Sequence, residues 1–332
     1  MSFDASAVAR PILCFGEALI DLHADGSDAR GFPARFVPFA GGAPANVAVA
    51  VARVGGAARF AGMLGTDPFG DFLLDSLQHA GVNTVDVART SDANTALAFV
   101  TLEANGERSF SFYRGPSADL LFRPEHFRAE TFNDVAVFHV CSNSMTDSAL
   151  AATTREGMQR AHEAGALVSF DINLRPALWH PDIDPRPSLW LALQLADVVK
   201  VSAEEFQWLA LDDEPATLDR LWRGRTRLVV VTDGAQTMRW FHPNAEGELP
   251  CYPVTAIDST AAGDAFVGGL LYQLAQLDAA PDRLDQLVTE LPRLHAMLRF
   301  AAACGALTVT RQGSFSALPH ADEVRAFMET HA

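Results

Sequence analysis

The sequence predicts an α/β fold with a central, mostly parallel sheet flanked by helices, and a second, smaller β-sheet. From about residue 134 onward, short apolar runs alternate with helical stretches, which is the pattern of repeated strand–helix units. The 332 residues, 49% of them hydrophobic, are enough to bury a large core. The dipeptide Asn105-Gly106 lies between two strand-like runs, and this hairpin signal predicts the smaller sheet.

The first part of the chain predicts two strands and two helices of the main layer. Pro11–Gly16 and Arg59–Gly65 are short apolar runs that end in glycine, so we expect buried strands. A helix is expected after the pair Gly41-Gly42, because Pro44 suits a first helical turn. A second helix is expected from Asp67 to about Ala80.

A hairpin and an irregular polar segment predict the smaller sheet. The runs Thr95–Leu102 and Arg108–Arg114 flank Asn105-Gly106, and the second run alternates. Phe110 and Phe112 share one face of it. This face can pack on a ligand or form a subunit interface, and we favour the interface. We expect a discontinuous lid of residues 23–40 and 95–118 over a body of residues 1–22, 41–94 and 119–332.

The second half of the chain predicts strands that end in polar residues. Strands are expected at 135–140, 166–171, 198–201 and 228–232, and a packed helix at 293–309. Open α/β sheets bind ligands at the carboxyl ends of their strands. We expect six polar residues to gather at this edge: Asp21, Asn173, Arg175, Glu205, Thr232 and Asp264. Such a gathering indicates a binding site.

The stretch Ile257–Phe266 carries the strongest chemical signal. Polar residues and then small residues precede Asp264 and an apolar run that is expected to be a buried helix. A helix that starts with small residues exposes backbone N–H groups and the positive end of its dipole, which suits an anion. An acid in that turn can take a proton from a hydroxyl. The stretch is therefore suited to phosphoryl transfer onto an alcohol; the alternative is a capped core helix whose Asp264 only complements the dipole.

Composition excludes several other classes of protein. The net charge of -16 disfavours nucleic acid and anionic membranes as partners, and no apolar run reaches membrane-spanning length. Lys200 is the only lysine and does not stand in a P-loop pattern. No Gly-x-Gly-x-x-Gly occurs, which disfavours a nicotinamide-dependent oxidoreductase.

The cysteines and the N-terminus favour a cytoplasmic protein. The four cysteines are far apart and form no Cys-x-x-Cys pair, so we expect reduced thiols and no structural zinc. Residues 1–10 lack the charged-then-apolar pattern of a secretory signal.

Two motifs resemble the signatures of the ribokinase-like (PfkB) family of carbohydrate kinases, and the resemblance covers essentially the whole chain. They are Gly41-Gly42-Ala43-Pro44-Ala45-Asn46 and Asp258-Ser259-Thr260-Ala261-Ala262-Gly263-Asp264. Three further stretches, Phe112–Asp119, Asp171–Pro176 and Lys200–Glu205, look like the bacterial fructokinase branch. The resemblance implies phosphorylation of a sugar hydroxyl by ATP, with D-fructose and fructose 6-phosphate as the expected pair. Alternatives are 2-keto-3-deoxygluconate kinase, ribokinase or a non-catalytic sugar or nucleotide sensor.

The resemblance also implies roles for single residues. Asp264 is the expected base, helped by Arg175 and by the N–H groups of Ala262, Gly263 and Asp264. The expected sugar-binding residues are Asp21, Gly41, Gly42, Asn46, Phe112, Arg114, Arg175 and Asp264. The expected nucleotide-binding residues are Lys200, Ser202, Thr232, Gly234, Ala261, Ala262, Gly263 and Ala302. Glu205 is expected to organise Mg²⁺ through water, Asp258 is a candidate for a K⁺ site, and the lid is expected to form a homodimer.

Two positions depart from the family pattern. Ala261 replaces the commoner first glycine of its motif, and we expect the anion site to survive this change. Ala302 stands where many relatives carry an asparagine near adenine, which leaves the adenine contacts open.

Overall fold

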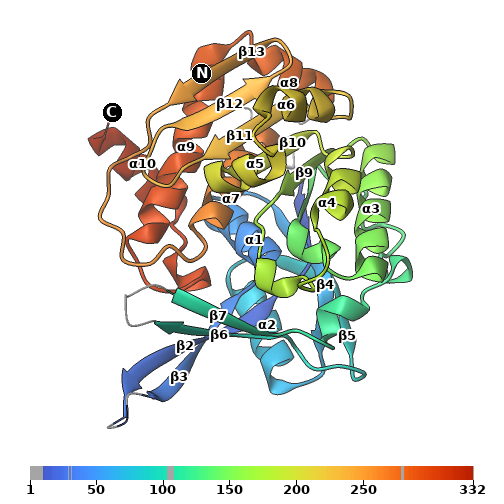
Figure 1. Cartoon of the computed structure of the whole chain (residues 1–332), viewed down its shortest axis with the longest axis vertical. Helices are drawn as coiled ribbons and strands as arrows, with labels where there is room; N and C mark the ends of the chain where they lie inside the picture. The colour runs from blue at the N-terminus through green and yellow to red at the C-terminus, as the bar shows by residue number, and fades with distance from the viewer. Residues whose placement is uncertain (1–9, 29, 31, 103–107, 278–279, 332) are drawn as a thin grey trace.

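The computed structural model describes residues 10–28, 30, 32–102, 108–277 and 280–331. Within them a nine-stranded sheet forms the centre, and a separate four-stranded sheet lies at one end (Figure 1). The order across the large sheet is β13 (Ala245–Leu249), β12 (Met238–His242), β11 (Leu228–Thr232), β10 (Val198–Ser202), β9 (Leu167–Asp171), β8 (Val137–Cys141), β1 (Ile12–Phe15), β4 (Ala58–Gly65) and β5 (Asn83–Thr90). The strands from β11 to β5 pair in parallel, whereas β12 and β13 are antiparallel.

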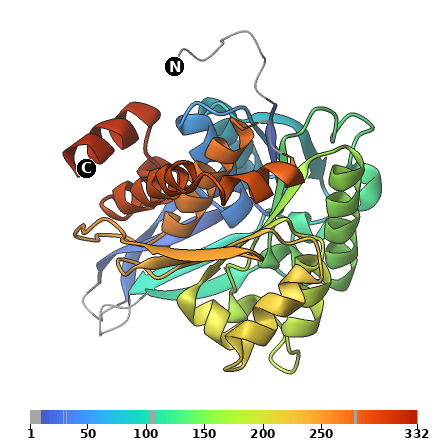
Figure 2. The same cartoon turned by 90° about the horizontal axis from the view of Figure 1, so that it is seen from above.

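Helices cover both faces of the large sheet (Figure 2). One face packs against α1 (Ala43–Arg53), α2 (Pro68–His79), α7 (Ala262–Ala275), α8 (Pro281–Leu287), α9 (Leu291–Val309) and α10 (Ala321–Thr330). The other packs against α3 (Ser148–Glu163), α4 (Arg186–Leu193), α5 (Ala203–Ala210) and α6 (Glu214–Trp222).

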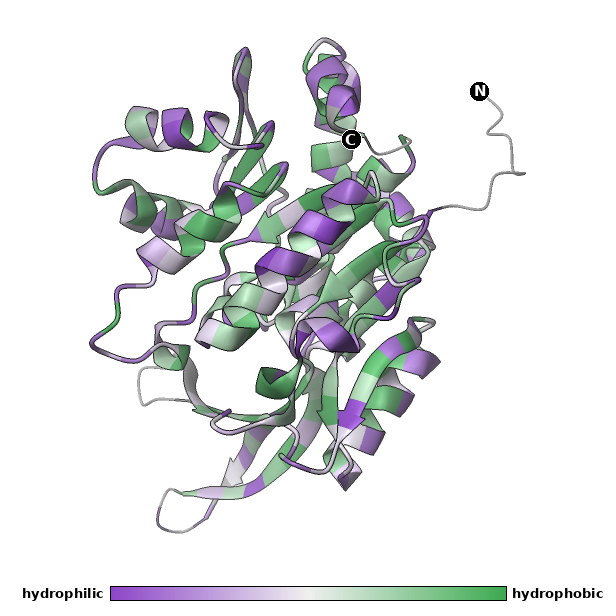
Figure 3. Cartoon of the chain, turned by 90° about the vertical axis from the view of Figure 1, so that its right-hand side faces the viewer, coloured by the Kyte–Doolittle hydropathy of each residue, from purple (hydrophilic) through white to green (hydrophobic). Residues whose placement is uncertain are grey.

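The central strands are apolar on both sides because both faces are covered. In β1, Ile12 and Cys14 belong to the apolar cluster on the α1 side, and Leu13 and Phe15 to the cluster on the α3 side. Figure 3 shows apolar residues concentrated on the central strands and polar residues on outward sides of helices. The strands predicted at 11–16, 59–65, 135–140, 166–171, 198–201 and 228–232 are confirmed, as are the helices predicted at 67–80 and 293–309.

The small sheet consists of β3 (Pro33–Gly41), β2 (Leu19–Ser27), β6 (Leu97–Leu102) and β7 (Arg108–Tyr113), in that order. The predicted hairpin is confirmed by the antiparallel pairing of β6 and β7; its expected turn at Asn105-Gly106 lies outside the described residues. The segment expected to be irregular over 23–39 instead supplies most of β2 and β3. The small sheet begins at Leu19, ahead of the expected lid boundary, and the division into lid and body stays a prediction.

The position of Asp21 corrects an expectation. We expected it where a strand of the main layer ends, but β1 ends at Phe15 and Asp21 lies within β2, opposite Phe39 of β3 and Ala98 of β6. The chain leaves the large sheet and enters the small one within three residues. Because of this, Asp21 comes from the small sheet.

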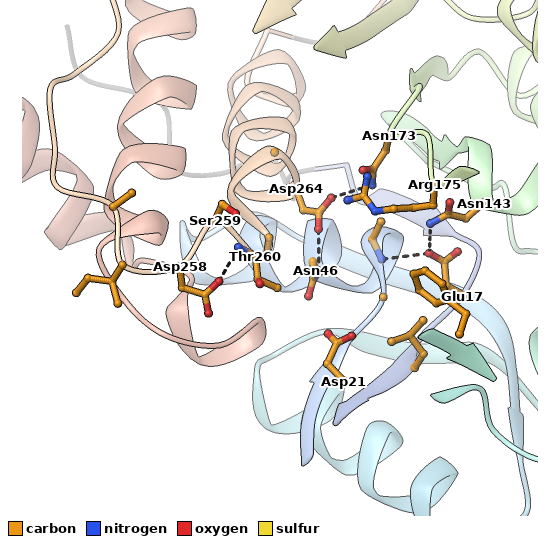
Figure 4. Close-up of a pocket in the computed structure, with 18 residues that line it drawn as sticks. Glu17, Asp21, Asn46, Asn143, Asn173, Arg175, Asp258, Ser259, Thr260 and Asp264 are labelled. Carbon is orange, nitrogen blue, oxygen red and sulfur yellow. Dashed lines mark hydrogen bonds between the residues drawn. The ribbon is translucent and has the colours of Figure 1, made fainter. Parts of the chain in front are cut away.

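Close packing of α1 against α7 brings the two predicted motifs together. A Cβ on Gly268 of α7 would lie 2.5 Å from the Cβ of Ala50 on α1, so glycine permits the helices to touch. Both helices begin at the same edge of the large sheet, which places Asn46 beside Asp264 (Figure 4). In the described part of the chain, no helix is both long and apolar enough to span a membrane.

Candidate active site

A cavity of about 770 Å³ lies beside the carboxyl ends of the parallel strands and includes residues of the small sheet (Figure 4). Nine predicted site residues line it: Asp21, Gly42, Asn46, Phe112, Arg175, Asp258, Ala261, Gly263 and Asp264. Asn173, which we expected at this edge, lines it as well. The cavity therefore joins residues that are up to 243 positions apart in the chain, from Asp21 to Asp264.

Asp264 is held in the first turn of α7 by two amides. Asn46 donates from Nδ2 to Oδ2 at 2.8 Å, and Asn173 donates from Nδ2 to Oδ1 at 3.4 Å. Burial raises the pKa of the Asp264 carboxyl, while Asn46, Arg175 and Lys200 oppose the rise. A carboxylate with a raised pKa is a better proton acceptor than an exposed one. This arrangement suits a general base.

The first turn of α7 forms the expected anion site. Ala261 precedes the helix in the left-handed region, with φ 61°, and no side chain caps the helix. Ala262 N–H donates to Ser259 O at 3.3 Å, so part of its capacity is used. The N–H groups of Gly263 and Asp264 belong to the first turn, where helical partners are missing. They are the donors best suited to an anion.

Lys200 lies beneath this turn rather than in the lining. A Cβ on Gly263 would stand 3.1 Å from Lys200 Nζ. The ammonium contacts both oxygens of Asp171 at 3.2 Å, and both side chains are buried. Burial raises the pKa of Asp171 to about 7, although Lys200 opposes the rise. The only lysine of the chain therefore puts a buried positive charge next to the anion site.

Asp21 enters the cavity from β2. Its Oδ2 accepts a hydrogen bond from Ser314 Oγ at 2.9 Å, and burial raises its pKa to about 6. A side chain on Gly41 would collide with this carboxylate, so Gly41 makes room for it without lining the cavity. Gly42 has φ 103°, a conformation that glycine adopts at low cost. Together the glycine pair lets the start of α1 approach Asp21.

Phe112 and Arg114 turn out to have different surroundings. Phe112, for which we favoured an interface, lines the cavity and packs against Leu19, Ala96 and Ala98. Arg114 does not line the cavity. Its Nε donates to Asp119 at 2.7 Å and its Nη1 to Asn143 O at 2.9 Å, and the side chain is buried. The side chain of Phe110 lies outside the described residues.

Five predicted nucleotide and metal residues lie outside the lining of this cavity: Ser202, Glu205, Thr232, Gly234 and Ala302. Ser202 and Glu205 form a capping box at the start of α5, with Glu205 Oε2 accepting from Ser202 N at 2.8 Å. Thr232 ends β11, and Ala302 is buried in α9. The nucleotide roles of all five stay predictions.

The residues present suit a hydrated magnesium ion better than a direct protein cage. Among the described residues, no group of three or more His, Cys, Asp or Glu side chains is placed to hold a metal. Glu205 Oε1 also accepts a hydrogen bond, from Leu174 N at 2.7 Å. Magnesium commonly keeps several waters and binds substrate phosphates. Asp258 instead ties two loops, with Oδ1 accepting from Thr260 N at 2.8 Å and Oδ2 from Gly313 N at 3.0 Å.

Sequence reasoning missed several residues of the site. Glu17 and Asn143 line the cavity, as do Leu19, Ala43, Ala256, Ile257, Ser259 and Thr260. Glu17 is an acid within the apolar run that follows β1, and this was the one local signal that could have identified it. Ser314 is 293 positions from Asp21, and no local pattern links the two.

Comparison with known proteins agrees with this geometry. The family model "pfkB family carbohydrate kinase" matches residues 9–321. Fructokinase-1 of Oryza sativa subsp. japonica is 42% identical over 323 residues, which are 96% of this chain and 98% of the relative. The structure of a fructokinase with bound ATP from Xylella fastidiosa is 53% identical with a TM-score of 0.92, covering 98% of this chain and 99% of that one. A fructokinase from Vibrio cholerae O395 in fructose, ADP and calcium ion bound form is 33% identical with a TM-score of 0.84, covering 96% and 99%.

Proposed function

The chain belongs to the pfkB family of carbohydrate kinases, and from that premise we propose that it transfers a phosphoryl group from ATP to the 6-hydroxyl of D-fructose. One observation carries the proposal: the buried carboxylate of Asp264 stands in the first turn of α7, inside a cavity lined by sugar-suited polar groups. The relatives named fructokinase, at 42% and 53% identity over nearly the whole chain, support fructose as the acceptor.

The side chains divide the chemistry between them. Asp264 Oδ2 is engaged by Asn46 at 2.8 Å, whereas the bond from Asn173 to Oδ1 is long, at 3.4 Å. Oδ1 is therefore the oxygen that accepts the proton of the sugar hydroxyl. The N–H groups of Gly263 and Asp264, with Arg175 and the charge of Lys200, stabilise the transferring group. Asp21 and Asn46 orient the sugar.

Magnesium, when bound, neutralises charge on the phosphates. The chain's own part is to hold the hydrated ion from a distance, and Glu205 is proposed to do so through water. ATP is proposed to lie along the edge marked by Ser202, Thr232, Gly234 and Ala302, on the far side of Gly263 from the sugar. Asp258 stays a candidate for organising K⁺.

The small sheet is proposed to act as a lid. Phe112 faces the cavity from β7 and Asp21 from β2, so movement of this sheet changes access to the sugar. A closed lid excludes water, which would otherwise compete with the sugar for the phosphoryl group.

The acid-substrate alternative loses its main argument. Arg114 favoured 2-keto-3-deoxygluconate because an arginine can pair with a carboxylate. In the structure this guanidinium already pairs with Asp119 and is buried. Ribokinase activity and a non-catalytic sensor are decided by the experiment that follows.

The test is ADP release by purified protein with MgATP and, in turn, fructose, 2-keto-3-deoxygluconate, ribose, adenosine or no sugar. We expect fructose-dependent turnover that is lost in Asp264→Ala, because only that variant lacks the base. Retention of more than about a tenth of the activity would exclude Asp264 as the base. Turnover with another sugar would change the substrate, and silence with ATP still bound would favour a sensor. Parallel runs in potassium and sodium salts test Asp258.

A further inference from the structure

Glu17 is a buried acid in the cavity wall for which the chemistry above has no use. The residue is 1% exposed and lines the cavity. Its Oε1 accepts hydrogen bonds from Ala43 N at 3.2 Å and from Asn143 Nδ2 at 2.9 Å (Figure 4). Its Oε2 is buried and has no hydrogen-bond partner among the described residues. Both known bonds hold protein, so Glu17 serves the architecture of the site rather than the sugar itself.

The start of α1 depends on this carboxylate. Gly42 occupies the N-cap position, and no side-chain cap is present. Glu17 Oε1 takes the place of a cap, because it accepts the N–H of the first helical residue, Ala43. The main chain fits equally closely, since a Cβ on Gly42 would lie 2.6 Å from Glu17 O. Glu17 therefore holds the first turn of α1 by both its side chain and its backbone.

The first turn of α1 carries one of the key side chains of the cavity. Asn46 lies three residues after Ala43, is 4% exposed and donates to Asp264 Oδ2 at 2.8 Å. A shift of this turn would move Asn46 relative to the proposed base and to the sugar. The path from Glu17 to Asp264 therefore has two steps, through α1 and then Asn46.

The second partner of Glu17 leads to the small sheet. Asn143 accepts, through its main-chain oxygen, the bond from Arg114 Nη1, and Arg114 directly follows β7. Burial raises the pKa of Glu17, while the charge of Arg114 opposes the rise. The same carboxyl group thus connects the start of α1 with the base of the small sheet.

We propose that Glu17 is a positioning residue for the sugar half of the reaction, which fixes the first turn of α1 and thereby sets Asn46 against both the sugar and Asp264. The proposal rests on the proposed function, because it assigns Glu17 to the sugar side of that same site. It predicts an effect that separates the two substrates, since the nucleotide residues lie on β10, β11 and α9 rather than on α1.

The test compares Glu17→Leu, which removes both acceptor oxygens, with Glu17→Gln, which keeps one. For Glu17→Leu we expect the fructose KM, and the fructose Kd by calorimetry, to rise about tenfold or more, because two buried donors lose their acceptor. The KM for ATP should stay within about twofold. Glu17→Gln should restore both sugar constants to within about threefold, because its oxygen can still accept the bond from Ala43. Thermal unfolding of each variant checks folding.

Three outcomes would overturn the proposal. One is an unchanged fructose KM and Kd in Glu17→Leu, and another is an equal rise in the KM for fructose and for ATP. If Glu17→Leu does not fold, Asn143→Ser removes only the donor to Glu17 and should raise the fructose KM in smaller measure; no rise there is the third. A wild-type protein that never phosphorylates fructose would instead overturn the proposed function, and the sugar found in its place would be used for the comparison.

Discussion

Asp21 and Asp264 are two buried acids that face one cavity with different partners. Asp21 accepts from a hydroxyl, Ser314 Oγ, and Asp264 from two amides. Burial raises the pKa of both carboxyl groups. Buried acids with shifted pKa values are costly to the fold and are typical of functional sites.

Asp21→Asn should stabilise the protein at neutral pH and weaken sugar binding. The pKa of Asp21 rises on folding from 3.8 to about 6, so folding takes up protons between these values. Stability therefore falls as pH rises from about 4 to about 6, by at most about 3 kcal/mol. The asparagine lacks this loss, so its gain should be present at pH 7 and vanish below about pH 4.

Urea unfolding at pH 7 and at the acid end of the folded range measures this gain, and steady-state kinetics measures the cost. The fructose KM should rise far more than the KM for ATP, because Asp21 is proposed to hold only the sugar. Asp75→Asn, at an exposed position on α2, is the matched control and should change neither quantity. A larger rise in the KM for ATP would place Asp21 elsewhere.

At the scale of single residues, sequence patterns identified side chains that lie inside motifs. Asn46 and Asp264 each sit in a recognisable helix start, and both line the cavity as predicted. Glu17 and Ser314 act through partners far away in the chain, and such pairs leave no local pattern. Arg114 illustrates the opposite case, because its motif was recognised but its guanidinium is turned into a buried ion pair.

At the scale of elements, the start of α7 stores backbone strain. Ala261 has φ 61° and ψ 6°, a left-handed conformation that costs an L-residue with a Cβ roughly 1–2 kcal/mol. Glycine avoids this cost but loses more entropy on folding. Ala261→Gly should therefore stabilise the protein by roughly 0.5–1 kcal/mol and leave turnover largely unchanged.

Chemical denaturation measures this change, and the same substitution at an ordinary helical site is its control. Ala326 is an exposed alanine inside α10, where glycine should destabilise by about 1 kcal/mol. The two substitutions are thus expected to have opposite signs. Destabilisation of Ala261→Gly by as much as Ala326→Gly would mean that position 261 is not strained.

Sequence patterns predicted the buried strands better than the edge strands. The strands from β1 to β11 are apolar on both sides, and their short apolar runs were recognised. The strands β5, β12 and β13 were not predicted. In β5 only one of eight residues, Asp86, is buried, and β13 alternates with glutamates, so neither presents an apolar run. Edge strands of this kind are defined by their neighbours rather than by local composition.

At the scale of the whole molecule, the small sheet has two apolar faces with different surroundings. Phe112 faces the cavity. The adjacent Tyr113 points the other way and meets Phe99, which meets Phe36, with ring centroids 5.1 Å apart in both pairs. Tyr113 is 66% exposed and Phe36 38%. A row of exposed rings on a sheet is typical of a protein–protein interface, which supports the proposed homodimer through the lid.

Replacing the two exposed rings should separate the subunits. We expect the wild-type protein to sediment as a dimer and Phe36→Ser/Tyr113→Ser as a monomer, because aromatic side chains supply much of the binding energy of such interfaces. Analytical ultracentrifugation measures the mass, with Leu191→Ser as the control. Leu191 is 52% exposed and lies on α4, away from the small sheet (Figure 1). Since the same strands carry Asp21 and Phe112, the monomer should also show a higher fructose KM. A monomeric wild type, or a double variant that stays dimeric, would exclude this face as the interface.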